Sequence, residues 1–240
     1  MENLIINDYL CNFLSNSELS IKYGLHRCTI QRILKKNGVI LRKKTPKIKV
    51  NHHFFSQYNE ISCYWAGFIL ADGYIRTNKR NSLVIKLKKS DSNHLKKFKN
   101  DIEYLGDVKI KNNYCILTIS SSKIINDLKE NFDITTKKSL TCFVSEKIPI
   151  KLMRHYIRGY FDGDGSITKT TTETISFLGT NKTLEYISDY FFSYCNIKLR
   201  TKDKPNITKN KNIFVIYYSG ISALKVLKIL YNSTEKPTNL

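Results

Sequence analysis

Hydrophobic residues follow two different periods along this chain. Ile61, Tyr64, Trp65, Phe68 and Ile69 have the spacing i, i+3, i+4, i+7, i+8, which is typical of a helix that packs one face against a core. The segments that follow alternate between apolar and polar residues, as strands with one buried face do. From residue 61 to 148 the pattern predicts helix, two strands, helix, two strands and helix, with hairpins within 74–88 and 107–120.

The same order of elements begins again after Pro149. The segment YWAGFILADGYI, residues 64–75, aligns without a gap on YIRGYFDGDGSI, residues 156–167, which lies 92 positions later. The apolar stripe is repeated at Met153, Tyr156, Ile157, Tyr160 and Phe161. Strands are expected near 166–171, 174–179, 199–202 and 213–218. The chain therefore contains two halves, and each half opens with the same helix.

Small residues stand four positions apart on another face of each repeated helix. They are Gly67 and Ala71 in the first helix, and Gly159 and Gly163 in the second. A glycine inside a helix costs about 1 kcal/mol relative to alanine, so glycine at matched positions indicates a close approach of two backbones. We therefore expect the two helices to pack side by side through these residues.

Such packing would bring Asp72 and Asp164 together at the C-terminal ends of the helices. Two carboxylates repel each other, and the negative ends of the helix dipoles add to the repulsion. A hard divalent cation with oxygen ligands would relieve it, and a metal held by carboxylates is suited to phosphodiester cleavage. The alternative is that each Asp-Gly pair is only a turn, but two pairs in register on repeated helices favour the metal site.

The charge of the chain indicates its partner. Lysine and arginine total 40 against 20 acidic residues, which gives a net charge of +20, and such an excess favours a polyanion, most often nucleic acid. No basic amphipathic helix, lipidation signal or membrane-spanning run is found, so we expect a soluble, intracellular protein that does not bind membranes. The six cysteines lack the spacing of zinc sites and are expected to be free, mostly buried thiols.

The N-terminal residues differ from the two halves. Apolar residues from Leu10 to Ile33 recur at helical spacing around Gly24, and residues 17–38 resemble a helix-turn-helix. Its second helix would present five side chains to DNA, namely Arg27, Thr29, Gln31, Arg32 and Lys35. The alternative is a helical hairpin that only packs on the core. We expect this module at residues 1–44, a basic linker at 45–57, and the two repeats at 58–148 and 149–240.

The segments WAGFILADG and IRGYFDGDG resemble the paired motifs of the LAGLIDADG homing endonucleases, in the single-chain form with two pseudo-symmetric repeats. The resemblance covers residues 58–240. It implies an α+β fold in which two αββαββα repeats form a saddle of antiparallel sheets on DNA. It also implies cleavage of both strands of double-stranded DNA across the minor groove, at a long asymmetric target, by a monomer that uses Mg²⁺ or another divalent cation such as Mn²⁺.

The resemblance also assigns roles to residues by their position in the motifs. It implies that Asp72 and Asp164 are the catalytic metal ligands, supported by the backbone carbonyls of Ala71 and Gly163. After the last helix of each repeat it implies a basic residue near the scissile phosphate. These residues would be Lys138 and Lys236, which would stabilise the transition state or orient water.

Two positions depart from the motifs of the family. Leu70 stands where the first motif often has a second aspartate, which the other motif keeps as Asp162. We do not expect this position to bind metal. Arg158 replaces a small residue, and we expect it to point away from the helix pair, towards the basic surface.

The strands predict a DNA-binding surface. Alternation along LVIKLKK sends Lys86 and Lys88 to the face opposite Ile85 and Leu87, which gives the sheet a core face and a basic face. Other basic residues would extend this surface, namely Arg76, Arg80, Lys109, Lys111, Lys169, Arg200 and Lys202. Most of them should contact phosphates, which gives a salt-dependent affinity without sequence information.

Two other functions are compatible with the same pattern. Some bacterial regulators combine a degenerate LAGLIDADG fold with a helix-turn-helix and bind DNA without cutting it, and the fold also supports intron-RNA maturases. Loss of the motif aspartates would be expected in a regulator, whereas Asp72 and Asp164 are both present here. The sequence therefore favours a homing endonuclease, encoded in an intron, in an intein or by a free-standing gene.

Overall fold

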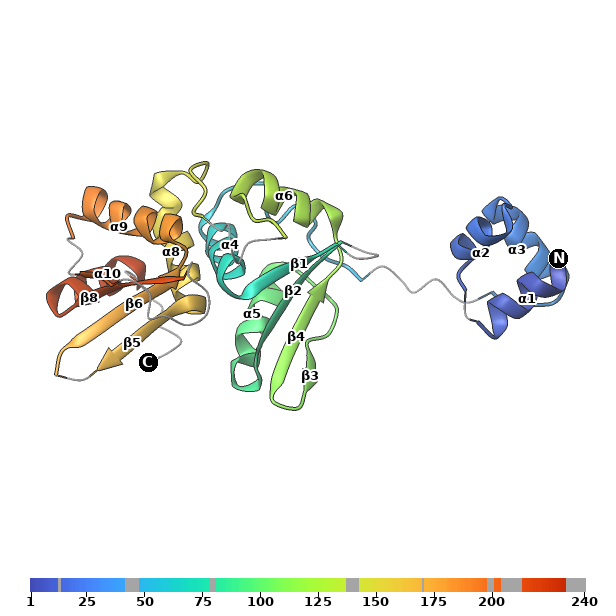
Figure 1. Cartoon of the computed structure of the whole chain (residues 1–240), viewed down its shortest axis with the longest axis horizontal. Helices are drawn as coiled ribbons and strands as arrows, with labels where there is room; N and C mark the ends of the chain where they lie inside the picture. The colour runs from blue at the N-terminus through green and yellow to red at the C-terminus, as the bar shows by residue number, and fades with distance from the viewer. Residues whose placement is uncertain are drawn as a thin grey trace. The chain divides into compact units, whose positions relative to one another are not determined.

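The structure is a computed structural model of the 240-residue chain. It describes residues 1–12, 14–41, 48–77, 81–136, 143–169, 171–197, 201–203 and 213–231, with the backbone alone for 201–203. The chain divides into two compact units, residues 1–47 and 48–240 (Figure 1). The boundary therefore falls within the basic stretch that the sequence gives as a linker.

The first unit is a bundle of α1 (Glu2–Leu10), α2 (Asn16–Tyr23) and α3 (Arg27–Lys36). A capping box formed by Ser15 and Glu18 starts α2, and Gly24 ends it with a φ of +65°. The helix α1 was not expected from the sequence, although its Ile5 and Tyr9 complete the core. The buried hydrophobic residues described in this unit are Ile5, Tyr9, Leu19, Ile30 and Leu34.

The first half of the second unit contains the predicted order of elements. They are α4 (Glu60–Asp72), β1 (Gly73–Arg76), β2 (Ser82–Lys88), α5 (Ser92–Asp101), β3 (Lys109–Lys111), β4 (Tyr114–Ile119) and α6 (Ser122–Phe132). A short 3₁₀ turn, η1 (Lys89–Asp91), precedes α5. The four strands form an antiparallel sheet in the order β1-β2-β4-β3.

The second half repeats this arrangement. Its elements are α8 (Ile150–Asp164), β5 (Gly165–Lys169), β6 (Glu173–Gly179), α9 (Asn181–Cys195), β7 (Thr201–Asp203), β8 (Phe214–Ser219) and α10 (Ile221–Tyr231). Its antiparallel sheet has the order β5-β6-β8-β7. Gly73 pairs with Ile85 and Gly165 pairs with Phe177, so the 92-residue shift extends through the first hairpin. The α+β class and the two αββαββα repeats are confirmed.

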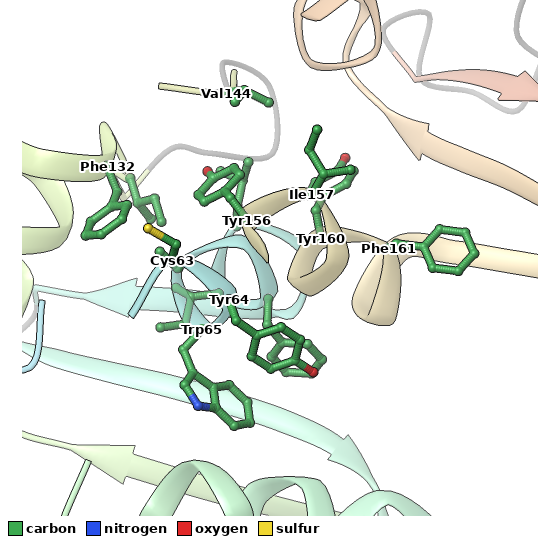
Figure 2. Packing of buried hydrophobic residues seen from close by; sticks show 14 of the residues in the cluster. Cys63, Tyr64, Trp65, Phe132, Val144, Tyr156, Ile157, Tyr160 and Phe161 are labelled. Carbon is green, nitrogen blue, oxygen red and sulfur yellow. The ribbon is translucent and has the colours of Figure 1, made fainter. Parts of the chain in front are cut away.

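The helices α4 and α8 lie next to each other at the centre of the second unit, with one sheet on each side (Figure 1). One continuous hydrophobic core joins the two halves. Figure 2 shows Trp65 of α4 pointing towards the first sheet and Phe161 of α8 towards the second, where its ring centroid lies 4.9 Å from that of Phe177. Ile61 departs from the predicted stripe, since it is 53% exposed at the start of α4.

The cysteines depart in part from the expectation that most of them are buried. Cys63 and Cys115 are buried and Cys195 is partly buried, but Cys11 and Cys28 are exposed in the first unit, where the small core leaves much of each helix uncovered. All five are free thiols, and Cys142 lies outside the described residues. Within the described ranges, no helix has the length and apolar character needed to cross a membrane.

Candidate active site

The contact between α4 and α8 is made by backbone atoms at two glycines. A Cβ atom at Gly67 would lie 1.9 Å from the carbonyl oxygen of Tyr156, and a Cβ atom at Gly159 would lie 1.9 Å from that of Tyr64. These contacts are equivalent, because Tyr156 is Tyr64 shifted by 92 positions. No side chain fits at that distance, so glycine is required at both places.

The helices stay close as far as their last residues. A Cβ atom at Gly163 would lie 2.4 Å from the Cβ of Ala71 and 3.3 Å from Oδ2 of Asp72. The helices then end at Asp72 and Asp164, and the chain enters the next strand directly. The terminal carboxylate of α4 therefore sits against the end of α8, where both helix dipoles are negative.

Two cavities open at these helix ends. One, of about 460 Å³, is lined by Asp72 from α4 and by Asp162 and Gly163 from α8. The other, of about 330 Å³, is lined by Asp164 from α8 and by Leu70 and Ala71 from α4. Each cavity therefore combines the terminal aspartate of one helix with the small residue that precedes the terminal aspartate of the other. We call them the Asp72 cavity and the Asp164 cavity.

The donor atoms of each cavity fit a hard divalent cation. Gly163 lines the Asp72 cavity together with three carboxylates, those of Asp72, Asp91 and Asp162, and Ala71 lines the Asp164 cavity together with the carboxylate of Asp164. Within the residues that the structure describes, no three His, Cys, Asp or Glu side chains form a group that could hold a metal. A closed zinc-type site is thus not formed there. Mg²⁺ is commonly bound through one or two carboxylates, with water and substrate phosphates as its other ligands.

A polar network links the two halves at the Asp72 cavity, which Asp162 and His94 line. Asp162 accepts hydrogen bonds from the hydroxyls of Tyr64, at 2.6 Å, and Tyr231. The Tyr64 hydroxyl also lies 3.2 Å from Nε2 of His94. The guanidinium of Arg158 lies 4.7 Å from the centre of the Tyr64 ring. Arg158 therefore faces the helix pair, and the expectation that it points away is wrong, because the Tyr64 ring and the Asp162 carboxylate attract its charge.

Burial changes the protonation of this network. Burial raises the pKa of Asp162, although the hydroxyls of Tyr231 and Tyr64 oppose this by stabilising the carboxylate. Burial, reinforced by the charge of Lys97, lowers the pKa of His94 to about 4. His94 is therefore neutral at neutral pH and does not add positive charge to the cavity.

The sequence did not identify several residues of this site. His94 and Lys97 come from α5, and Tyr231 comes from the last described turn of α10. Nothing in their local pattern marks them, because they meet the motif helices only in three dimensions. Lys138 and Lys236, which the resemblance gave as catalytic, lie outside the described residues.

The first sheet presents five exposed basic residues on one face. Cross-strand partners of an antiparallel sheet project to the same side, and Lys86 and Lys109 both pair with Ile116, while Lys88 and Lys111 both pair with Tyr114. The Lys86 ammonium lies 4.0 Å from the centre of the Tyr114 ring. The basic face consists of Arg76, Lys86, Lys88, Lys109 and Lys111.

The second sheet lacks this basic face in its first hairpin. The shift of 92 positions places Thr168, Leu178 and Thr180 where the first sheet has Arg76, Lys86 and Lys88. Lys169 pairs with Glu173 in the register and forms an ion pair with it at 3.5 Å. Successive side chains of a strand project to opposite sides of the sheet. Lys169 therefore projects away from the side of Thr168, which corresponds to the basic face of the first sheet. Arg80 and Arg200 lie outside the described residues, as does the side chain of Lys202.

The candidate DNA-reading residues of the first unit lie on α3. Arg27, Arg32 and Lys35 are exposed, and Thr29 and Gln31 are partly exposed. Ile30 and Leu34 point into the core instead. This helix therefore has one face that packs and one polar, basic face that is open to solvent.

Comparisons with known proteins agree with this geometry. Residues 151–231 match the family described as LAGLIDADG-like domain. No curated protein matches the sequence significantly.

Solved structures resemble the chain in fold. The LAGLIDADG meganuclease I-AabMI, bound to uncleaved DNA, is 14% identical, with a TM-score of 0.51 over 76% of this chain and 86% of that chain. The meganuclease I-SmaMI, bound to uncleaveable DNA, is 12% identical, with a TM-score of 0.52 over 75% and 87%. Residues 151–231 are thus similar to the LAGLIDADG-like domain, and the second unit has the fold of the LAGLIDADG homing endonucleases.

Proposed function

We propose that this protein is a site-specific, metal-dependent homing endonuclease that hydrolyses a phosphodiester bond in each strand of double-stranded DNA. The pair of cavities at the ends of α4 and α8 supports this function. Each cavity has its own terminal aspartate, Asp72 or Asp164, next to a small residue of the other helix. Two such sites in one chain suit the cutting of two strands.

The residues of each cavity have a defined part in the reaction. Asp72 with the backbone of Gly163, and Asp164 with that of Ala71, would hold a divalent cation such as Mg²⁺ or Mn²⁺. When bound, the cation supplies an activated water and neutralises charge on the phosphate. Glycine at positions 67 and 159 keeps the two helices in close backbone contact, and both aspartates are proposed to face one minor groove. Lys138 and Lys236 are proposed to stabilise the transition state.

Double-stranded DNA is the proposed partner. The net charge of +20 and the basic face of the first sheet support it, and the related meganucleases were solved with DNA bound. Because the two sheets present different side chains, the target should be long and asymmetric, and a monomer would suffice to recognise it. The polar face of α3 is proposed to add contacts as a helix-turn-helix. Because its DNA substrate lies inside the cell, the protein is also proposed to be soluble and intracellular.

The test is to incubate the purified protein and Mg²⁺ with DNA from the uninterrupted region around its gene, and separately with a randomised DNA library. A discrete double-strand cut, lost when EDTA replaces Mg²⁺, is the expected result. Tight, specific binding without a cut would instead support a regulator. A gain in intron splicing without DNA cleavage would support a maturase.

A further inference from the structure

We infer that the outer face of the second sheet reads thymine in one half of the DNA target, through contacts of apolar side chains with the C5-methyl group of that base. This inference rests on the proposed endonuclease function and names a base that one half of its substrate must hold. It is drawn from the side chains that the second sheet presents in place of the lysines of the first sheet.

The strand register shows which residues share the outer face of the second sheet. Leu178 pairs with Val215, and cross-strand partners project to the same side of an antiparallel sheet. Phe177 and Ile216, which alternate with this pair along β6 and β8, are buried in the core on the other side. The described residues of the outer side, which we call the second outer face, are Ser166, Thr168, Thr174, Ser176, Leu178, Val215, Tyr217 and Ser219.

The second outer face differs in character from the basic face of the first sheet. None of its described residues is a lysine or an arginine, whereas the basic face has five. The shift of 92 positions puts Leu178 at the place of Lys86. Leu178 is 41% exposed, and its partner Val215 is partly exposed. The second sheet therefore offers an open apolar pair where the first sheet offers an ammonium group.

The remaining side chains of the second outer face carry hydroxyl groups. A hydroxyl both donates and accepts hydrogen bonds, so a serine, threonine or tyrosine can bond to the edge of any base pair and distinguishes poorly between bases. Two of these residues, Thr174 and Ser219, bond to each other, with their hydroxyl oxygens 3.0 Å apart. The hydroxyls therefore add contacts with DNA, whereas the choice of base depends on Leu178 and Val215.

The edges of the bases in the major groove offer different partners to these side chains. Guanine presents two acceptors, O6 and N7, which suit the ammonium of a lysine such as Lys86, whereas thymine presents a methyl group, which suits an apolar side chain. A guanine opposite Leu178 would lose the water on its acceptors without gaining a donor in return. Equivalent positions of the two halves of the target should therefore hold guanine at Lys86 and thymine at Leu178.

The position of Leu178 brings DNA to the second outer face. Leu178 lines the Asp164 cavity, and the two sheets lie on either side of α4 and α8 (Figure 1). A duplex that is held for cleavage at Asp164 therefore also lies against Leu178. It continues over the second outer face on one side of the helix pair and over the basic face on the other, so the two faces read the two halves of one target.

The test is to select bound sequences from a randomised duplex library in Ca²⁺. The wild type should enrich thymine in one half of the target. Leu178→Lys should favour guanine over thymine there by about tenfold and leave the other half unchanged. Leu224→Lys, at an exposed position of α10, is the matched control and should select the wild-type sequence. Selection of the wild-type sequence by Leu178→Lys would overturn the inference. Failure of the wild type to select any sequence would instead overturn the proposed endonuclease function.

A second experiment removes only the methyl group. The thymine that Leu178→Lys identifies is replaced by uracil, and the affinity is measured by fluorescence anisotropy in Ca²⁺. The wild type should bind the uracil target about fourfold more weakly for each methyl lost. Leu178→Ala should bind both targets equally, because its side chain no longer contacts the methyl. Uracil outside the protected footprint is the control and should change neither affinity. Equal binding of both targets by the wild type, or the same loss in Leu178→Ala, would contradict the assignment.

Discussion

At the scale of single residues, the site depends on the absence of a Cβ atom at Gly67 and Gly159. Their Cα atoms allow the carbonyl oxygens of Tyr156 and Tyr64 to approach to a distance that excludes a Cβ. The sequence predicted this contact because glycine inside a helix is unfavourable and was found twice at matched positions. It did not predict the partners of Asp162, because Tyr64 and Tyr231 lie 98 and 69 residues away in the chain.

The glycine contact predicts an unusual response to alanine. In an open helix, Gly→Ala stabilises by about 1 kcal/mol. Here, Gly67→Ala and Gly159→Ala should each lower the free energy of unfolding by about 3 kcal/mol, because the added Cβ must push two backbones apart. Urea unfolding measures this. Ile61→Ala on the exposed start of α4 serves as the control and should change stability by less than about 1 kcal/mol. Gly67→Ala with wild-type stability would exclude the close contact.

At the scale of elements, the sequence predicts the repeat wherever the two halves are related by a constant shift of 92 positions. That shift runs through the helix and the first hairpin of each half, so the strands and their register follow from it. Other features could not be read in this way. The helix α1 has a weak apolar pattern and is held by packing on α2 and α3. The side of the sheet to which Lys169 projects depends on the strand register, and a shift of one residue would move it to the other side.

The two sheets should differ in how their DNA contacts respond to salt. Each lysine that neutralises a phosphate adds about 0.9 to the slope of log affinity against log salt. Lys86→Gln and Lys88→Gln should each weaken binding and reduce that slope by about 0.9, measured by fluorescence anisotropy in Ca²⁺. Ser166→Ala and Ser176→Ala, a cross-strand pair in the first hairpin of the second sheet, are the controls and should leave the slope unchanged. An unaltered slope in both lysine variants would mean that this face does not contact DNA.

At the scale of the whole molecule, the chain joins a small helical unit to a two-repeat unit. The polar face of α3 predicts that the first unit adds to the DNA-binding site. Gln31→Ala and Arg32→Ala in the full-length protein should shorten the footprint on target DNA at one end and weaken binding by about 1–3 kcal/mol each. Ile21→Ala, at an exposed position of α2, should have no effect. A full-length footprint in both α3 variants would favour a unit that only packs.

We propose that Asp72 and Asp164 form paired hydrolytic sites on a DNA-binding fold. The double variant Asp72→Asn, Asp164→Asn is compared with the wild type on one cleavable target. Removing both carboxylates should reduce double-strand cleavage in Mg²⁺ by at least about 1,000-fold. The affinity for DNA should stay within about threefold, because the basic face is unchanged. Cleavage by the double variant at the wild-type rate would show that these two carboxylates do not form the hydrolytic sites.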